Sequence, residues 1–206
     1  VYKRQEWYEQ DKEYWLKRVQ NFPKAPEFTF MKNPEEVMIP HFARKEAEIA
    51  RGDWEKIKER SRKIGITPSV FLLTAYSEIL SRWSKTLRFA LNLTLFNRLP
   101  VHKDVERLVG DFTTLTLLEI DREHDTGTNF VERAKRVQKQ LMADLEHSYF
   151  SGVEMQRKLG NDRKIPVVFT SGLGVDTWDE GNWIGKLVYN ISPVSYTHLT
   201  LPTILL

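Results

Sequence analysis

The 206-residue sequence contains no cysteine, so it has no disulfide, no thiolate nucleophile and no thiolate metal ligand. It also lacks an apolar run near the roughly 20 residues that a membrane-spanning helix needs, and a cytoplasmic location is the default expectation. The charge is almost balanced, with 31 basic and 28 acidic residues. Because nucleic-acid binding surfaces carry clustered positive charge, this balance argues against a nucleic-acid partner.

Common catalytic motifs are missing as well. The sequence has no HExxH, P-loop, GxGxxG or GxSxG pattern. None of the histidines lies at metal-ligand spacing with another histidine or a carboxylate; they are His41, His102, His124, His147 and His198. The sequence therefore predicts no metal site and no directly bound cofactor.

The most informative stretch runs from 88 to 121, where two strand-like segments flank a turn-rich middle. Segment 89–96 is almost entirely apolar and segment 112–118 alternates threonine with apolar residues, so both favour β-structure. Small polar residues then fall at strand ends and on strand faces, where a site could be built: Asn92, Asn97, Asp111 and Thr113. The same pattern is typical of an ordinary buried hairpin or crossover, in which these residues serve turns and strand ends.

Helices and strands are predicted to alternate along the rest of the chain. Apolar periodicity predicts helices over 6–22, 54–64, 68–83, 128–147 and 152–159, with a proline-rich linker over 23–40. The predicted helix caps are Asp53, Thr67, Thr128 and Ser151, and Gly65 is the predicted C-terminal stop. Further strands are expected over 42–50, 165–170 and 186–192. This order predicts an α/β domain with a mixed β-sheet packed with helices, and a deeply buried helix over 68–83.

Three strings resemble core motifs of the heterocyclization domains of nonribosomal peptide synthetases, which are relatives of condensation domains. They are LNLTLFNRLP (91–100), GDFTTLTLLEID (110–121) and PVVFTS (166–171), in the family's order and at compatible spacings. The resemblance extends over about 6–192 and implies a chloramphenicol acetyltransferase-like lobe. It also implies that 6–40 is an interlobe helix and linker, and that 41–193 is the C-terminal lobe of the domain.

The two ends of the chain read differently. VYKRQ (1–5) and VSYTHLTLPT (194–203) resemble translations of the two ends of a transposase sequencing adaptor, and such segments are set aside before fold reasoning. We expect 1–5 and 194–206 to be foreign to the domain and the chain to be a fragment of a longer reading frame. A natural terminal strand over 196–206 is the alternative.

The resemblance implies the chemistry and its partners. The family joins a carrier-bound acyl group to carrier-bound Cys, Ser or Thr, and cyclodehydrates the product to a thiazoline or oxazoline. Both substrates are held on the phosphopantetheine of peptidyl or aryl carrier proteins. The adjacent adenylation domain and the N-terminal lobe are further expected partners. Siderophores and other peptide natural products are the implied products.

Thr170 is the candidate catalytic residue, with Asn92, Asn97, Asp111, Thr113 and Ser171 along the substrate channel. In the family, the threonine of PVVFTS acts with an aspartate from a later motif, SQTPQVxLDxQ. Ile191 and Ser192 would open that motif, so the aspartate falls near position 200, where this chain has Thr200. The partner aspartate is therefore expected to be absent, and the fragment alone to be inactive.

Other interpretations remain open. By pattern alone, Thr170 ends a buried strand before a glycine-rich loop, and its hydroxyl could simply satisfy a nearby carbonyl. A condensation domain that forms the amide without cyclising is one alternative. A non-catalytic lobe that only docks carrier proteins, for example through the basic helix face over 56–63, is another.

Overall fold

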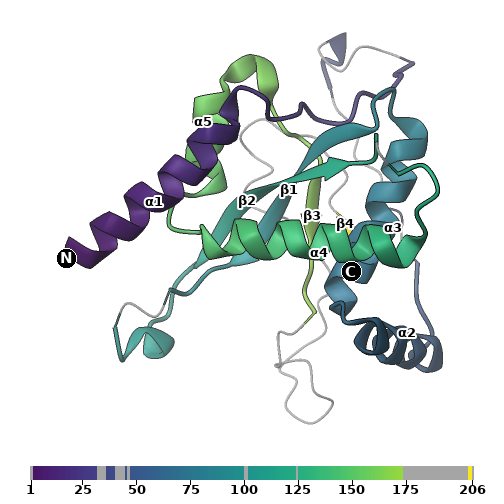
Figure 1. The fold of residues 1–206 in the computed structure, drawn as a ribbon, viewed down its shortest axis with the longest axis horizontal. Coiled ribbons are helices and arrows are strands. Elements are labelled where there is room, and N and C mark those ends of the chain that lie inside the picture. The colour runs from purple at the N-terminus through teal and green to yellow at the C-terminus, as the bar shows by residue number, and fades with distance from the viewer. Residues whose placement is uncertain are drawn as a thin grey trace.

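The computed structural model describes residues 2–31, 36–39, 45, 47–99, 102–123, 125–173 and 204–205. Along these residues, three α-helices precede the first two strands, and two more α-helices separate those strands from the last two (Figure 1). The helices are α1 (Tyr2–Val19), α2 (Arg51–Ile64), α3 (Pro68–Trp83), α4 (Phe130–Glu146) and α5 (Gly152–Leu159), with 3₁₀ turns η2 (Val105–Arg107) and η3 (Asn161–Arg163). The strands are β1 (Arg88–Phe96), β2 (Thr113–Asp121), β3 (Val168–Thr170) and β4 (Ile204–Leu205).

Within the described residues these strands form one sheet in the order β2-β1-β3-β4. β1 pairs with β2 in antiparallel fashion, with Arg88 opposite Asp121. β1 pairs with β3 in parallel, with Thr94 opposite Thr170. The sheet is therefore mixed, and the predicted α/β class is confirmed.

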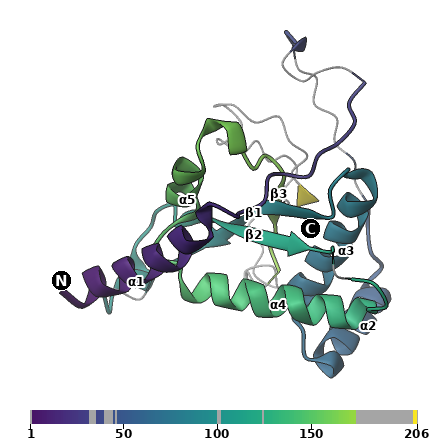
Figure 2. The same ribbon diagram turned by 45° about the horizontal axis from the view of Figure 1, so that its top comes forward.

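Both faces of the sheet are covered by helices, as Figure 2 shows for α4 on one side and α5 on the other. Because side chains alternate along a strand, Phe89, Leu91 and Leu93 of β1 share one face and pack in a core cluster with α3 and α4. We call this the α3/α4 face. Ala90 points to the opposite face, in a second core cluster with side chains of α1 and α5. We call that the α1/α5 face.

The predicted N-terminal helix is confirmed, although its limits differ. α1 begins at Tyr2, inside the segment that resembles adaptor sequence, and ends at Val19. Its predicted apolar face is the one that packs, since Trp15 is 1% exposed and Tyr8, Val19 and Phe22 belong to the same cluster. The Trp15 indole N–H also donates to the backbone oxygen of His147 at 2.9 Å, which fixes the helix on the domain.

Two of the four predicted helix N-caps are confirmed. Thr67 accepts from the Val70 N–H at 3.2 Å, and Ser151 forms a capping box with Glu154. Gly65 ends α2 in the left-handed conformation, with φ of 76°, also as predicted.

The other two predicted caps are wrong. α2 begins at Arg51 after Ala50, so Asp53 already lies in the first turn and pairs with Lys56 instead. α4 is capped by Asn129, because its side chain accepts from the Glu132 N–H while the Glu132 carboxylate returns to the cap. The Thr128 hydroxyl instead donates to the backbone oxygen of Asp125 at 2.8 Å.

The expectation that α3 is deeply buried is wrong for part of its surface. Ile79 is 54% exposed and Trp83 is 74% exposed. The buried side carries hydroxyl residues as well as apolar ones, namely Thr74, Ser77 and Ser81. Each of these three hydroxyls donates to a carbonyl three or four residues earlier in the same helix, so its own donor is satisfied despite burial.

The predicted strands are confirmed in part. β1 and β2 agree with 89–96 and 112–118, whereas β3 is only three residues long. Residue 45 and residues 47–50 lie in no strand, so the strand predicted over 42–50 is wrong where it is described. The glycine-rich loop is predicted over 171–185, and its part from 174 onward lies outside the described residues, as does the strand predicted over 186–192.

β4 falls within the segment 194–206 that resembles adaptor sequence, and pairs in parallel with β3. An open sheet edge can pair with any extended segment, whether or not that segment is native to the domain. The contact therefore does not test the foreign origin of the tail, which stays a prediction. No single described helix has the length and apolar content to cross a membrane. Among the described helices, α2 and α3 taken together would be long and apolar enough, but they are bent by 98° relative to each other.

Candidate functional site

The residue singled out by the sequence, Thr170, lies at the carboxyl end of β3 beside Thr94 of β1. The two threonines are Cα partners in the parallel pair, and the Thr170 hydroxyl donates to Thr94 Oγ1 at 3.0 Å. Both side chains are half-buried. Thr170 is therefore not sealed in an apolar core, and its hydroxyl has an oriented partner.

Asn92 lies two residues before Thr94 on the same face of β1. Its backbone N–H donates to the Val167 oxygen at 2.9 Å. Its side-chain oxygen Oδ1 is buried, and no donor among the described residues reaches it. An unpartnered buried acceptor costs about 1–3 kcal/mol, so a donor from outside this set of residues would stabilise it. We call Asn92, Thr94 and Thr170 the polar row.

The polar row lies on the α1/α5 face of the sheet, because Asn92 and Thr94 keep the parity of Ala90. Toward the core the row is followed by Ala90, and Leu117 of β2 lies opposite Asn92; both belong to the apolar cluster on this face. In the other direction it is followed by the Phe96–Thr113 pair at the end of the hairpin. The row therefore lies between the packed core and the exposed end of β1, where Phe96 is 64% exposed.

Asp111, Thr113 and Asn97 shape that end of the hairpin. The Thr113 N–H donates to Asp111 Oδ1 at 2.8 Å, and the Asn97 N–H donates to the Phe112 oxygen at 3.0 Å. Hydrogen bonds from the side chain and backbone of Thr113 lower the pKa of Asp111 below its usual value. Asp111 and Thr113 are exposed. These residues therefore form hydrogen bonds of the turn, and they lie at or beside the next residue pair of the hairpin on that face after the polar row.

Arg98 fixes the loop that follows β1. Its guanidinium lies 4.1 Å from the Phe112 ring centroid and donates to the carbonyls of Val105 and Leu108, each at 2.9 Å. These contacts hold η2 against the hairpin, so the loop has a defined shape where it follows Asn97.

Ser171 points away from the polar row. Its hydroxyl lies 2.9 Å from that of Ser69 in the first turn of α3, on the α3/α4 face. The structure thus brings together Asn92 and Thr170, places Asp111 and Thr113 at the adjoining hairpin end, and separates Ser171. Position 200 lies outside the described residues, so a carboxylate partner for Thr170 stays a prediction.

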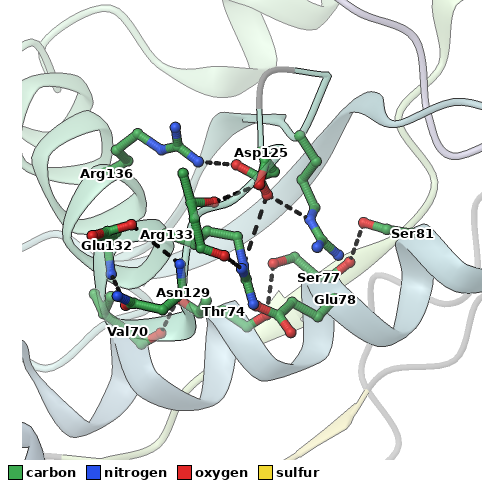
Figure 3. Close-up of polar contacts among 12 residues, drawn as sticks. Val70, Thr74, Ser77, Glu78, Ser81, Asp125, Asn129, Glu132, Arg133 and Arg136 are labelled. Atoms are coloured by element: carbon green, nitrogen blue, oxygen red, sulfur yellow. Dashed lines mark hydrogen bonds and ion pairs between the residues drawn. The ribbon is translucent and has the colours of Figure 1, made fainter.

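A cavity of about 310 Å³ lies elsewhere, at the carboxyl end of β2 between α3 and α4. Figure 3 shows Asp125 facing Arg136 and Arg133, with Glu78 beside Arg133. Arg133 Nε donates to Glu78 at 2.7 Å and Arg122 Nε donates to Asp125 at 2.8 Å. These ion pairs tie α3, α4 and the turn after β2 together, and the cavity is remote from Thr170. Among the described residues, no three metal-ligating side chains gather.

Thr94 is the residue that sequence reasoning missed. Its alternation with Leu93 and Leu95 does indicate a polar position on one strand face. Its role beside Thr170 depends on β1 and β3 being neighbours, and 75 residues separate these two threonines in the chain; no local pattern carries that information.

This mixed sheet, with its three motif strings in β1, β2 and β3, is that of a condensation domain. The chain belongs to the condensation-domain family, whose family model matches residues 1–197. Bacitracin synthase 1 of Bacillus licheniformis is 38% identical over 172 residues, which cover 81% of this chain and 3% of that protein. Phenyloxazoline synthase MbtB of Mycobacterium tuberculosis is 35% identical over 176 residues, covering 80% of this chain and 12% of that protein.

Among solved structures, the EpoB cyclization-docking bidomain from Sorangium cellulosum is similar, with a TM-score of 0.73 and 38% identity. The match covers 82% of this chain and 35% of the EpoB chain. The fold is accordingly the chloramphenicol acetyltransferase-like fold of condensation domains. The chain spans about a third of that bidomain and a small part of the curated relatives.

Proposed function

We propose that this chain is the C-terminal lobe of a heterocyclization domain. The complete domain condenses a carrier-bound acyl group with carrier-bound Cys, Ser or Thr and closes the product to a thiazoline or oxazoline. The observation that carries this proposal is the Thr170 hydroxyl, held by Thr94 at the end of an inner strand. The likeness to a phenyloxazoline synthase and to a cyclization domain supports it.

The reaction requires a proton to be removed from the attacking group and a proton to be delivered to the oxygen that leaves. The acceptor amine first displaces the carrier thiol from the acyl thioester and forms an amide. The side-chain thiol or hydroxyl then adds to the amide carbonyl carbon, losing its proton while the carbonyl oxygen gains one. Loss of that oxygen as water, with the nitrogen proton, leaves the C=N bond of the ring.

The polar row offers groups suited to the second stage. The Thr170 oxygen can accept a hydrogen bond from the hydroxyl that is to leave, or from a protonated carboxylic acid that delivers the proton. A positioned group of this kind typically contributes ~10²- to 10⁴-fold to the rate. The unpartnered Asn92 Oδ1 can accept an N–H of the substrate.

The partners follow from the reaction. Two carrier proteins deliver the substrates on phosphopantetheine, an adenylation domain loads one of them, and the N-terminal lobe closes the reaction channel. Tethering both substrates supplies proximity. The basic face of α2 is less suited to carrier docking than its composition indicates. Its lysines already pair with carboxylates one turn away, as in Lys56–Asp53, Lys58–Glu55 and Lys63–Glu59.

The test uses the two-lobe domain with its own C-terminal continuation, combined with loaded carrier proteins, and mass spectrometry of the released product. We expect a product one water lighter than the linear amide, and we expect Thr170→Ala to lower its formation. Ser171→Ala is the matched control, since that hydroxyl faces α3. A wild-type product that retains the water favours an amide-forming domain, and no product at all favours a carrier-docking lobe.

A further inference from the structure

The hydrogen bond between Thr170 and Thr94 has a direction. The Thr170 hydroxyl is the donor and Thr94 Oγ1 is the acceptor, at 3.0 Å. A hydroxyl carries one proton and two lone pairs. Once its proton is committed to Thr94, Thr170 Oγ1 can only accept from any further group, and its rotation is fixed by the bond.

Backbone pairing makes this geometry rigid. Thr94 and Thr170 are Cα partners in the parallel β1–β3 pair, and both are β-branched, which restricts rotation about the Cα–Cβ bond. Both side chains leave the sheet on the α1/α5 face, the face of the unpartnered Asn92 Oδ1. The Asn92 oxygen lacks a donor among the described residues, and Thr170 presents an acceptor on the same face, two residues further along β3 than Val168, which lies opposite Asn92.

We propose that Thr94 is a positioning residue, which holds the Thr170 hydroxyl oxygen as an acceptor toward the leaving hydroxyl of the ring-closed intermediate. Thr94 acts through Thr170 and does not touch the reacting atoms. This inference rests on the proposed function. It gives a role in the reaction to Thr94, for which neither the motif resemblance nor the position of Thr170 predicts one. A cross-strand threonine pair also supports a sheet, so stability is measured alongside activity.

The experiment uses the two-lobe domain with loaded carriers and follows linear amide and cyclised product separately. The variants are Thr94→Val, Thr170→Val, the double variant and Thr94→Ser, with thermal unfolding of each. Valine keeps the β-branched shape and removes only the hydroxyl. Thr114→Val is the control, because Thr114 is a half-buried threonine of the same sheet that faces α3 and α4.

We expect Thr170→Val to slow cyclisation ~100-fold and Thr94→Val to slow it about tenfold, both with unchanged amide formation. The double variant should be no slower than Thr170→Val, because residues that act as a unit are not additive. Thr94→Ser should stay within about threefold of the wild type, since it restores the acceptor. Thr114→Val should cyclise at the wild-type rate.

Several results would overturn the inference. Normal cyclisation by Thr94→Val removes Thr94 from the mechanism, and so does a double variant whose losses multiply. Equal losses of amide and ring, together with a lowered unfolding temperature, assign Thr94 to the sheet alone. A wild-type domain that releases only linear amide overturns the proposed function as well. The wild-type product therefore distinguishes failure of the proposed function from failure of the Thr94 inference alone.

Discussion

Arg18 and Asp144, 126 residues apart in the chain, form a hydrogen-bonded ion pair of 2.5 Å between α1 and α4. Asp144 is fully buried, and its Oδ1 also accepts from the Tyr14 hydroxyl at 2.8 Å and from Gln140 at 3.0 Å. Arg18 reaches Glu119 of β2 with its other nitrogen. The pair thus fastens the N-terminal helix to the domain through a helix and a strand at once.

Arg18→Met should destabilise the chain strongly. The change leaves the Asp144 carboxylate buried without its cation, and removing one partner of a buried pair costs about 3–5 kcal/mol. Urea unfolding of the chain measures the loss. Lys17→Met is the matched control one position away, because the Lys17–Glu13 pair is exposed and such pairs contribute about 0–1 kcal/mol. Equal effects of the two changes would contradict the anchoring role of Arg18.

Gly152→Ala should destabilise the chain although alanine favours helices. A Cβ at Gly152 would lie 2.7 Å from the backbone oxygen of Leu115, so α5 would have to move away from β2. Overpacking of this kind costs about 1–3 kcal/mol. Gly52→Ala in α2 is the control, because nothing lies within 4 Å of its Cβ position and the helix should gain up to about 1 kcal/mol. Opposite signs in urea unfolding are the expected result, and a neutral Gly152→Ala would show that α5 can shift freely.

Glu154 links the stability of α5 to pH. Burial raises the pKa of Glu154, but hydrogen bonds from Ser151 and Tyr8 outweigh it and leave the pKa below its usual value. A lowered folded-state pKa contributes stability that is complete above the unfolded pKa of about 4.3 and is lost as pH falls through the folded pKa.

Replacing Glu154 with glutamine should therefore flatten the acid limb of the stability curve. Glu154→Gln lowers stability at neutral pH, where the charged bonds to Ser151 and Tyr8 are lost. The stability of the variant should fall less steeply than that of the wild type between ~pH 5 and ~pH 3. Unfolding midpoints measured across this range check the prediction. Parallel acid limbs would show that Glu154 is not the group responsible.

Local chemistry made much of this fold predictable. Thr67 followed by Pro68, and Ser151 followed by Glu154, are cap signals that need no tertiary contact, and both are confirmed. The strand-like character of β1 and β2 follows from their β-branched and apolar residues. The three motif strings also led to the correct family.

The features that could not be predicted from the sequence depend on three-dimensional geometry or on pairing between distant segments. Thr128 and Asn129 are both good cap residues, and the choice between them depends on which side chain reaches Glu132. Burial of Thr74 and Ser77 depends on hydroxyls that bond to their own helix, which a hydrophobicity pattern does not register. The polar row required the neighbour relation of β1 and β3, which is a property of the sheet and not of either segment.

A comparison of Thr67→Ala with Asp53→Ala tests whether the observed cap hydrogen bond, and not the residue type alone, decides the loss of unfolding free energy. The Thr67 side chain accepts the Val70 N–H at 3.2 Å at the start of α3, so its removal should cost about 1 kcal/mol. Asp53 lies inside α2 and makes no cap; it forms an exposed pair with Lys56 at 2.9 Å, which is worth about 0–1 kcal/mol. Urea unfolding of both variants gives the two losses on one scale. Since aspartate is at least as good an N-cap as threonine by type, a larger loss for Asp53→Ala would mean that α2 begins later in solution than at Arg51.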